Sequence, residues 1–234
     1  MTQLHPIQAK WPAENPGILQ LYSFPTPNGI KISAMLEETG IAYEPHLVNI
    51  LKNETWMPEF LALNPNGKIP AILDPNGPDG KPLALFESGA ILIYLAEKTG
   101  KLMPTNPALR IETIQWVFFQ MAAVGPIFGQ YGFFHKFAGK AIEDKRPHDR
   151  YRDESRRLAA VLEQRLIGRR HIMGDDYTIA DIALWPWVRT ARDFYEGAED
   201  LQLTEKANLM AWLDRCAARP ASQAALNIPK RPET

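Results

Sequence analysis

The stretch ILQLYSFPTPNGIKISAMLEETG, residues 18–40, decides how the first part of this chain folds. It begins with a short apolar run, 18–24, which is typical of a buried strand. After a turn of prolines, an asparagine and a glycine, apolar residues recur with helical spacing up to Gly40, which ends the helix. A strand followed by an amphipathic helix predicts a βαβ unit, in which the helix crosses over to a parallel strand.

The turn inside this stretch has two interpretations. Thr26 is a good N-cap, Pro27 is favoured at the first helical position, and Asn28 then lies in the first turn. Helix initiation alone explains all three residues. The same helix start also offers N–H groups without intrahelical partners, the positive end of the helix dipole and a hydroxyl group, which together can stabilise a thiolate.

The chain up to residue 100 continues the alternation of strands and helices. The loop DPNGPDGKP, residues 74–82, consists of turn residues and predicts a hairpin. The order βαβ, α, hairpin, α predicts a parallel pair of strands with an antiparallel edge. The expected segments are a strand at 42–50, a helix at 55–64, a turn and strand over 64–73, a strand at 83–86 and a helix at 87–100.

We interpret the proline-rich segment 101–107 as a linker. After it, the sequence shows only helical patterns and no further strands. The expected helices are 108–134, 149–167, 178–194, with a kink at Pro186, and 203–219, ending before Pro220. Thr178 and Asp181 form a capping box, which is a folding signal. The sequence therefore predicts an α/β domain at 18–100 and an all-helical domain at 108–225. We expect an extended N-terminal arm, 1–17, which Trp11 could hold to the surface, and a tail, 226–234.

The composition, 45% hydrophobic and 23% charged over 234 residues, is that of a soluble globular protein. The net charge of −1 argues against partners such as nucleic acid or anionic membranes. Neither a secretory signal nor a run of about 18 apolar residues is seen, so we expect a cytoplasmic protein without a membrane span. The single cysteine, Cys216, excludes an intramolecular disulfide, a Cys-x-x-Cys motif and a thiolate metal cage, and we expect no metal ligands.

Three motifs, together with this order of elements, resemble the cytosolic glutathione transferases. They are NGKIPAIL at 66–73, FESGAILIYLAE at 86–97 and GDDYTIADIALWPWV at 174–188. Two shorter motifs, TPNGIK at 26–31 and GPIFGQ at 125–130, resemble the bacterial nu class of that family. The resemblance implies a thioredoxin-like N-terminal domain with a mixed four-stranded sheet, a C-terminal helical bundle domain, and a homodimer.

The resemblance also implies a binding site for glutathione, a tripeptide with two carboxylates, an ammonium group and a thiol. A cis Ile69-Pro70 bond would turn the backbone of Ile69 outward as an edge that pairs with the peptide, although Pro70 could merely begin an edge strand. Lys68 would lie near the glycyl carboxylate. Glu87 and Ser88 stand where a strand meets a helix start, so Ser88 can bind the γ-glutamyl carboxylate and Glu87 the ammonium group. A plain N-cap serine is the alternative.

Further residues are carried over from the family with looser motifs. Asn53 and Thr55 fall where the family makes another glutathione contact, and Arg150 matches an arginine that nu-class proteins direct toward a glutathione carboxylate. Tyr131, Phe134 and His135, in the segment 128–137, are candidate walls of the cleft, although such apolar spacing is equally typical of a core. These assignments extend the site into the second domain.

The sulfur end of glutathione is assigned to the opening turn. Nu-class members place a threonine and an asparagine beside the sulfur, and these match Thr26 and Asn28. Tyr22, four residues before the turn, is interpreted as a core residue of the strand. Because Cys216 lies in the final helix, thiol–disulfide chemistry would use the sulfur of glutathione itself.

Two functions of different classes follow from these residues. In the first, the chain is an enzyme in which the glutathione thiolate attacks either an electrophilic carbon or a disulfide, and the nu-class resemblance favours the disulfide. In the second, the chain is a non-catalytic glutathione-binding or protein-interaction module of the same fold. The set Lys68, Pro70, Glu87 and Ser88 favours the enzyme, because an interaction module has no need of a tripeptide-binding site.

Overall fold

The structure is a computed structural model that describes residues 5–231. The chain forms two compact units, one comprising the residues up to Thr99 together with those from Pro220 onward, and the other Gly100–Arg219. The outermost parts of the predicted arm and tail, residues 1–4 and 232–234, lie outside the described residues.

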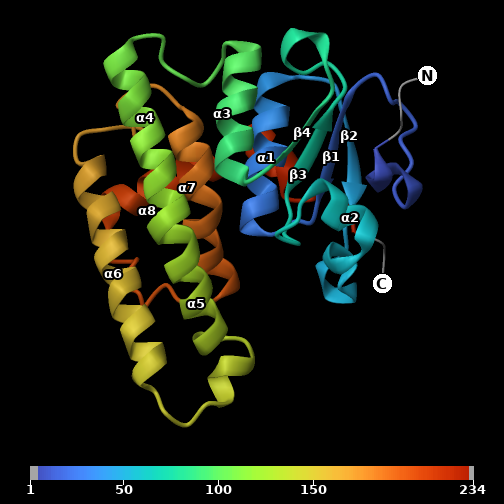
Figure 1. The fold of residues 1–234 in the computed structure, drawn as a ribbon. Helices are drawn as coiled ribbons and strands as arrows, with labels where there is room; N and C mark the ends of the chain where they lie inside the picture. The colour runs from blue at the N-terminus through green and yellow to red at the C-terminus, as the bar shows by residue number, and fades with distance from the viewer. Residues whose placement is uncertain (1–4, 232–234) are drawn as a thin grey trace. The chain divides into compact units, whose positions relative to one another are not determined.

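The first unit is built on a four-stranded mixed sheet, as predicted (Figure 1). The strand order is β2-β1-β3-β4, with β1 parallel to β2 and antiparallel to β3, and β3 antiparallel to β4. The strands are β1 (Leu19–Ser23), β2 (Tyr43–Leu47), β3 (Ala71–Asp74) and β4 (Leu83–Phe86). All five residues of β1 are buried, as expected for a central strand.

Helices connect these strands at the predicted places. They are α1 (Pro27–Thr39), α2 (Pro58–Leu63) and α3 (Ser88–Thr99), with short 3-10 turns η1 (Pro6–Ala9), η2 (Ile50–Lys52), η3 (Glu54–Trp56) and η4 (Pro78–Gly80). The segment predicted as a strand at 42–50 ends earlier, at Leu47, and the predicted helix at 55–64 is divided between η3 and α2. Pro58 at the first position of α2 explains this division, since proline favours the start of a helix over its interior.

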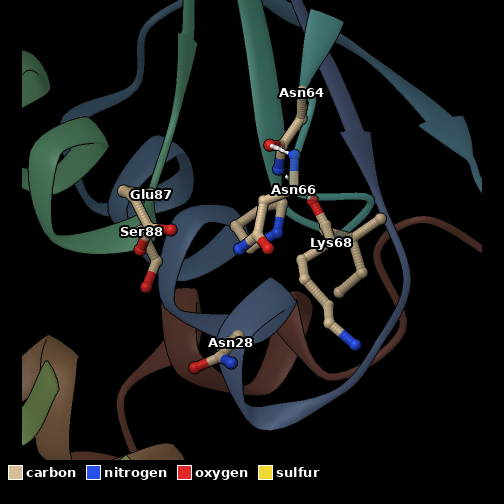
Figure 2. Close-up of a pocket in the computed structure, with 8 residues that line it drawn as sticks. Asn28, Asn64, Asn66, Lys68, Glu87 and Ser88 are labelled. Carbon is tan, nitrogen blue, oxygen red and sulfur yellow. Dashed lines mark hydrogen bonds between the residues drawn. The ribbon is translucent and has the colours of Figure 1, made fainter. Parts of the chain in front are cut away.

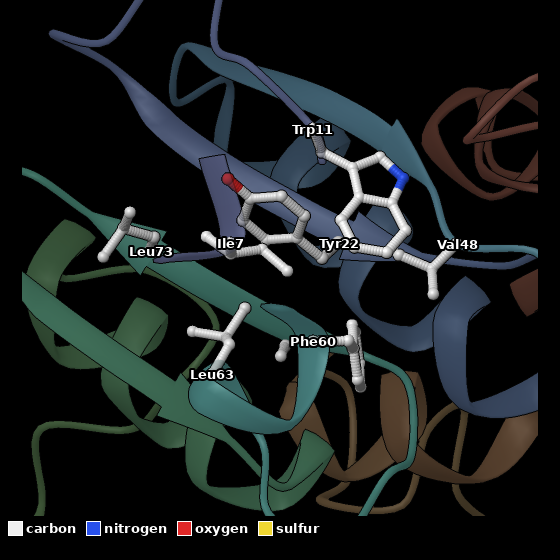
Figure 3. Packing of buried hydrophobic residues seen from close by; sticks show 8 residues of the cluster. Ile7, Trp11, Tyr22, Val48, Phe60, Leu63 and Leu73 are labelled. Atoms are coloured by element: carbon white, nitrogen blue, oxygen red, sulfur yellow. The ribbon is translucent and has the colours of Figure 1, made fainter. Parts of the chain in front are cut away.

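Trp11 anchors the N-terminal arm, as predicted, but Ile7 and Trp11 lie in the core of the first unit, not on its surface as we expected (Figure 3). Ile7 is fully buried, and Trp11 packs edge-on against Tyr22 and Phe60. The indole N–H of Trp11 donates to the Leu47 carbonyl at 2.9 Å. Two large apolar side chains within five residues stabilise this packing, and the short 3-10 turn η1 brings both to the same side.

The C-terminal segment also belongs to the first unit, so our boundary of the helical domain at residue 225 was wrong. Helix α9 (Pro220–Ala225) packs against α1. Beyond it, the Ser33 hydroxyl donates to the Ile228 carbonyl at 3.0 Å. The sequence patterns of α8 and α9 are both helical, and helical periodicity does not indicate which unit a helix joins.

The second unit consists of helices, as predicted. They are α4 (Pro107–Phe119), η5 (Gln120–Val124), α5 (Gly125–His135), η6 (Ala138–Ala141), α6 (Arg146–Leu166), α7 (Ile179–Arg189), η7 (Thr190–Phe194) and α8 (Ala207–Ala217). The helix predicted at 108–134 is interrupted by η5, and the helix predicted at 178–194 ends in η7; both η5 and η7 are π-helical turns. Such turns insert one residue into the helical pattern and leave little trace in apolar periodicity.

The predicted capping box at the start of α7 is present. The Thr178 side chain accepts from the Ala180 N–H at 3.3 Å, and the Thr178 N–H donates to Asp181 Oδ2 at 2.9 Å. The other Asp181 oxygen accepts from Ile172 N and Trp212 Nε1. Burial raises the pKa of Asp181, and these hydrogen bonds oppose the shift.

The continuous helical stretch Pro107–His135 has a length and a mean hydropathy, 1.2, that would suffice for one membrane span. Our expectation of no such segment considered uninterrupted apolar runs, whereas this stretch includes polar residues such as Glu112 and Gln120. A core helix of a soluble protein meets the same criterion.

Candidate functional site

A pocket of about 230 Å³ opens in the first unit, where the start of α1, the loop before β3 and the start of α3 come together (Figure 2). Figure 2 shows Glu87 and Ser88 on one side of this pocket, Lys68 on the opposite side and Asn28 below them. The lining residues are Asn28, Asn64, Asn66, Lys68, Ile69, Pro70, Glu87 and Ser88. Six of these eight residues belong to the site that the sequence predicted.

The start of α1 is held close to the end of β1. Thr26 is the N-cap, and its hydroxyl oxygen accepts from the Gly29 N–H at 3.4 Å. A Cβ atom at Gly29 would lie 2.0 Å from the Phe24 carbonyl oxygen, so this position requires glycine. Thr26 is not itself one of the residues that line the pocket, but it precedes the lining residue Asn28 by two positions. The glycine therefore fixes where the first turn of α1 stands in the pocket.

Lys31, one helical turn after Asn28, is fully buried beside the pocket. Its ammonium group donates to Asn28 Oδ1 at 2.8 Å and to Ser88 Oγ at 3.3 Å. Burial holds the pKa of Lys31 well below its ordinary value, and the nearby Glu87 carboxylate opposes this shift. Lys31 thus links the helix start of α1 to that of α3. Its burial was not predicted, because a lysine in an amphipathic helix is usually solvated.

The loop before β3 is organised by Asn64, whose side chain is buried. Its Nδ2 group donates to the Lys68 carbonyl at 2.6 Å, and its Oδ1 atom accepts from the Asn66 N–H at 2.9 Å. The Ile69-Pro70 peptide that follows is cis, as the family resemblance implied. Asn64 and Asn66 are lining residues that our sequence analysis missed, although an Asn-Pro-Asn-Gly run is itself a turn signal.

Glu87 has an uncommon backbone conformation at the start of α3. Its φ angle is 72°, in the left-handed region that side chains other than glycine rarely adopt. Ser88 follows as the first residue of α3 and is buried, whereas Glu87 is exposed. Strain of this kind persists where the surrounding structure needs a side chain in a particular place. Here it sets the Glu87 carboxylate at the rim of the pocket beside a helix start.

Asn53 and Thr55 are not among the residues that line this pocket, and their contact with glutathione stays a prediction. Asn53 is an exposed residue in the left-handed conformation between η2 and η3, and Thr55 is buried within η3. Arg150 is exposed on α6 of the second unit, one turn before Glu154, and its contact with a glutathione carboxylate stays a prediction.

The three predicted wall residues lie on α5 of the second unit. Tyr131 is fully buried and its hydroxyl donates to Asp200 Oδ2 at 3.0 Å, which contradicts a place on a cleft wall. Phe134 is half-buried and stacks on Tyr151, and His135 is half-buried and stacks on Tyr131. For Phe134 and His135 the wall position stays a prediction.

Tyr22 is the core residue that the sequence predicted. It is fully buried and stacks on His46 with 4.7 Å between ring centroids. Burial strongly raises the pKa of its hydroxyl group.

The pocket is suited to a small polar molecule that carries both signs of charge. Lys31 and Lys68 supply cations, Glu87 supplies an anion, and the starts of α1 and α3 supply backbone N–H groups. The amide groups of three asparagines can donate and accept. A ligand with carboxylates at its ends and an ammonium group matches this arrangement.

Models of one protein family match both units. The N-terminal domain of glutathione S-transferase matches residues 18–97, and its C-terminal domain matches residues 147–215. The disulfide-bond oxidoreductase YfcG of Escherichia coli is 42% identical over 212 residues, which cover 89% of this chain and 94% of YfcG. The chain therefore belongs to the glutathione S-transferase family.

Solved structures show the same relationship. A glutathione transferase from Burkholderia graminis, solved with two glutathione molecules bound per subunit, is 62% identical and has a TM-score of 0.97. The alignment covers 99% of this chain and 98% of that chain. A glutathione transferase from Pseudomonas putida, with one glutathione disulfide bound per subunit, is 54% identical with a TM-score of 0.95, over 96% and 97% of the two chains.

Proposed function

We propose that this chain binds glutathione in the pocket of the first unit and uses the glutathione thiol in transferase or disulfide-reductase chemistry. The observation that carries the proposal is the convergence of Asn28, Lys68, Ile69, Pro70, Glu87 and Ser88 on one pocket from three separate segments. Relatives solved with glutathione or its disulfide support it.

Each end of glutathione has a partner in this proposal. Ser88 and the N–H groups at the start of α3 bind the γ-glutamyl carboxylate, and Glu87 binds the neighbouring ammonium group. The Ile69 backbone pairs with the central peptide unit, and Lys68 lies near the glycyl carboxylate. Lys31 adds a buried positive charge behind Ser88, since its Nζ atom lies 3.3 Å from Ser88 Oγ. A charge of this kind strengthens carboxylate binding because burial weakens its screening by solvent.

The sulfur is activated at the start of α1 in this proposal. The Thr26 hydroxyl and the N–H groups of the first turn stabilise the thiolate relative to the thiol, and so lower the thiol pKa from about 8.5. Lys31 holds the Asn28 side chain by the 2.8 Å hydrogen bond, so the amide group has one orientation. Preorganised donors are effective because they need no rearrangement when the charge forms.

With a disulfide as the second substrate, the reaction has two exchange steps. The glutathione thiolate attacks one sulfur, forms a mixed disulfide and releases the other half as a thiolate that takes up a proton. A second glutathione thiolate attacks the mixed disulfide, releases the remaining thiol and forms glutathione disulfide. The substrate disulfide is reduced and two glutathiones are oxidised. In conjugation, the same thiolate forms a bond to an electrophilic carbon and expels the leaving group.

We further propose that the protein is a nu-type homodimer of the cytoplasm, where glutathione keeps thiols reduced. Support for a dimer comes from α4, where the large apolar residues Ile111 and Phe118 are 66% and 61% exposed. They stand seven residues apart and therefore share one helix face. Apolar residues on one face are typical of an interface. Analytical ultracentrifugation tests the dimer. The wild-type protein should sediment with twice the mass of one chain, and the Ile111→Glu variant with the mass of one chain.

The test of the proposed function is a glutathione titration followed by two assays. Calorimetry is expected to show saturable binding of glutathione, with an increase in melting temperature. Reduction of 2-hydroxyethyl disulfide by glutathione is then compared with conjugation to an aryl halide. Absence of binding at millimolar glutathione would contradict the proposal, and conjugation without disulfide turnover would reverse the preference for disulfides.

A further inference from the structure

Two histidines and an aspartate of the second unit lie close to one another. None of the three is among the residues that line the pocket of the first unit. His135 ends α5, His148 lies in the first turn of α6, and Asp200 follows η7. His135 Nδ1 lies 3.2 Å from His148 Nε2 and 3.6 Å from Asp200 Oδ2, and the third separation, from His148 Nε2 to Asp200 Oδ2, is 3.7 Å. The three potential ligand atoms therefore form a nearly equilateral triangle.

The size of this triangle suits a small divalent transition metal. The point in the plane of the triangle that is equidistant from the three atoms lies about 2.0 Å from each, and a tetrahedral ion slightly out of this plane would lie about 2.1 Å from each. Bonds from zinc to histidine nitrogen and carboxylate oxygen measure about 2.0–2.2 Å. Calcium requires longer bonds and more oxygen ligands, and magnesium prefers oxygen in place of imidazole. The ligand set and the distances thus both favour zinc over calcium and magnesium.

Neighbouring side chains orient all three groups. His148 Nδ1 lies 3.3 Å from Asp149 Oδ1, so a proton on Nδ1 leaves the lone pair of Nε2 directed at the cluster. Tyr131 stacks on His135 and donates to Asp200 Oδ2 at 3.0 Å. A carboxylate oxygen has two lone pairs, so Oδ2 can accept this bond and still coordinate a metal.

The arginines nearby leave the triangle accessible. Arg156 lies 3.8 Å from the other Asp200 oxygen, Oδ1, and Arg152 pairs with Asp149. Both guanidinium groups are thus placed on carboxylate oxygens that do not form the triangle. The side chains of His135, His148 and Asp200 are 26%, 19% and 28% exposed, so an ion can enter from solvent.

We propose that His135, His148 and Asp200 form a zinc-binding site with three protein ligands and an open fourth position. Three ligands plus water is the usual arrangement of an accessible zinc site. The ion would connect α5, α6 and the segment after η7, and thereby stabilise the second unit. We expected no metal on the ground of the single cysteine. The three ligands proposed here are 13 and 52 residues apart in the chain and form no spacing motif that would have indicated them.

Calorimetric titration of the tag-free full chain with Zn²⁺ tests the site. Glutathione is omitted, because its thiol also binds zinc. The proposal predicts one Zn²⁺ per chain and a rise in melting temperature. The single variants His135→Gln and His148→Gln should each weaken binding at least tenfold, and Asp149→Asn about tenfold through the orientation of His148.

The matched control is His5→Gln, which changes a histidine of the first unit and should leave zinc binding unchanged. Circular dichroism and the melting shift with glutathione establish that each variant is folded. Absorption of the Co²⁺-loaded protein should show nitrogen and oxygen ligands without thiolate, which separates this site from Cys216. Absence of a saturable Zn²⁺ site, or equal affinity in the histidine variants, would overturn the proposal.

Discussion

Lys31 places an ammonium group in the interior of the first unit, where it contacts Asn28 and Ser88. A buried charge is costly unless it is paired and hydrogen-bonded, so such a residue is seldom kept for stability alone. Its position between the two ends of the proposed glutathione site gives it a function. It holds the Asn28 amide and adds positive charge behind the carboxylate-binding serine.

Replacement of Lys31 by methionine should separate binding from stability. Loss of the charge behind Ser88 weakens the attraction for the bound carboxylate, and we expect about a tenfold rise in the glutathione Kd. The melting temperature of the free protein should stay the same or increase, because methionine of similar length replaces a buried charge. Calorimetry and thermal unfolding measure the two effects. Lys81→Met, on the exposed hairpin, is the control, and equal Kd values for both variants would contradict the role of Lys31.

Thr26 should matter more for turnover than for folding. Thr26→Ala removes a donor to the developing thiolate, and we expect about a hundredfold lower turnover of 2-hydroxyethyl disulfide. Loss of an N-cap costs about 0.5–2 kcal/mol, and the 3.4 Å bond here favours the lower end. Thr26→Ser keeps the hydroxyl group and should retain most activity. Unchanged turnover in Thr26→Ala would leave this residue as a simple helix cap.

At Glu87 the effect of the carboxylate charge on glutathione binding can be separated from the effect of the strained backbone on stability. Glu87→Gln removes the carboxylate but keeps the strained conformation at φ 72°, so glutathione binding should weaken about tenfold with unfolding unchanged. Glu87→Gly removes the same charge and also relieves the strain, so its free energy of unfolding should increase. Calorimetry and urea titration measure these quantities. If both variants bind glutathione like the wild type, Glu87 does not pair with the ammonium group.

At the scale of single residues, the site residues that belong to a local motif could be predicted from the sequence, whereas those buried by tertiary contacts could not. Asn28, Lys68 and Ser88 stand in turns or at helix starts, where spacing indicates their position. Lys31 and Asn64 are polar residues that become buried only when separate segments meet. Lys31 ends the TPNGIK motif and Asn64 begins an Asn-Pro-Asn-Gly turn, but neither pattern indicates that the side chain is buried.

At the scale of elements, the contact between the end of β1 and the start of α1 sets the position of the activating turn. A Cβ atom at Gly29 would lie 2.0 Å from the Phe24 carbonyl oxygen and 2.6 Å from Ser23 Oγ. Helix α1 would have to move away from β1 to accept a side chain. The turn that contains Thr26 and Asn28 would move with it.

Gly29→Ala should therefore both destabilise the protein and lower activity. Overpacking of this kind costs about 1–3 kcal/mol or more in unfolding free energy, which urea denaturation measures. The control is Gly17→Ala, where a Cβ atom would meet no atom within 4 Å. A Gly29→Ala protein as stable and active as Gly17→Ala would show that the close approach is not needed.

Elements were predictable where propensity and tertiary structure agree. The strands, the hairpin and the capping box at Thr178 follow from apolar patterns and turn residues. The π turns η5 and η7, and the packing of α9 on α1, depend on contacts distant in sequence. The arm was read as extended for the same reason, since Ile7 and Trp11 are buried only by residues of the sheet and α2.

At the scale of the whole molecule, the single cysteine restricts the redox mechanism. Cys216 is fully buried in α8 of the second unit. Cys216→Ala should therefore keep the wild-type rate of 2-hydroxyethyl disulfide reduction, with glutathione as the sole source of thiol. As a control, glutathione is titrated into the variant to establish that its binding is unchanged. Loss of turnover without loss of glutathione binding would assign the protein thiol a role.

The central claim is that the start of α1 activates the thiol of bound glutathione, and the thiolate absorbance of the complex tests it most directly. Titration of this ultraviolet absorbance with pH gives the pKa of the bound thiol. We predict a value at least one unit below the ordinary ~8.5 in the wild type and in Cys216→Ala, and a return toward ~8.5 in Thr26→Ala. A wild-type complex whose thiol titrates at its ordinary value would contradict the account.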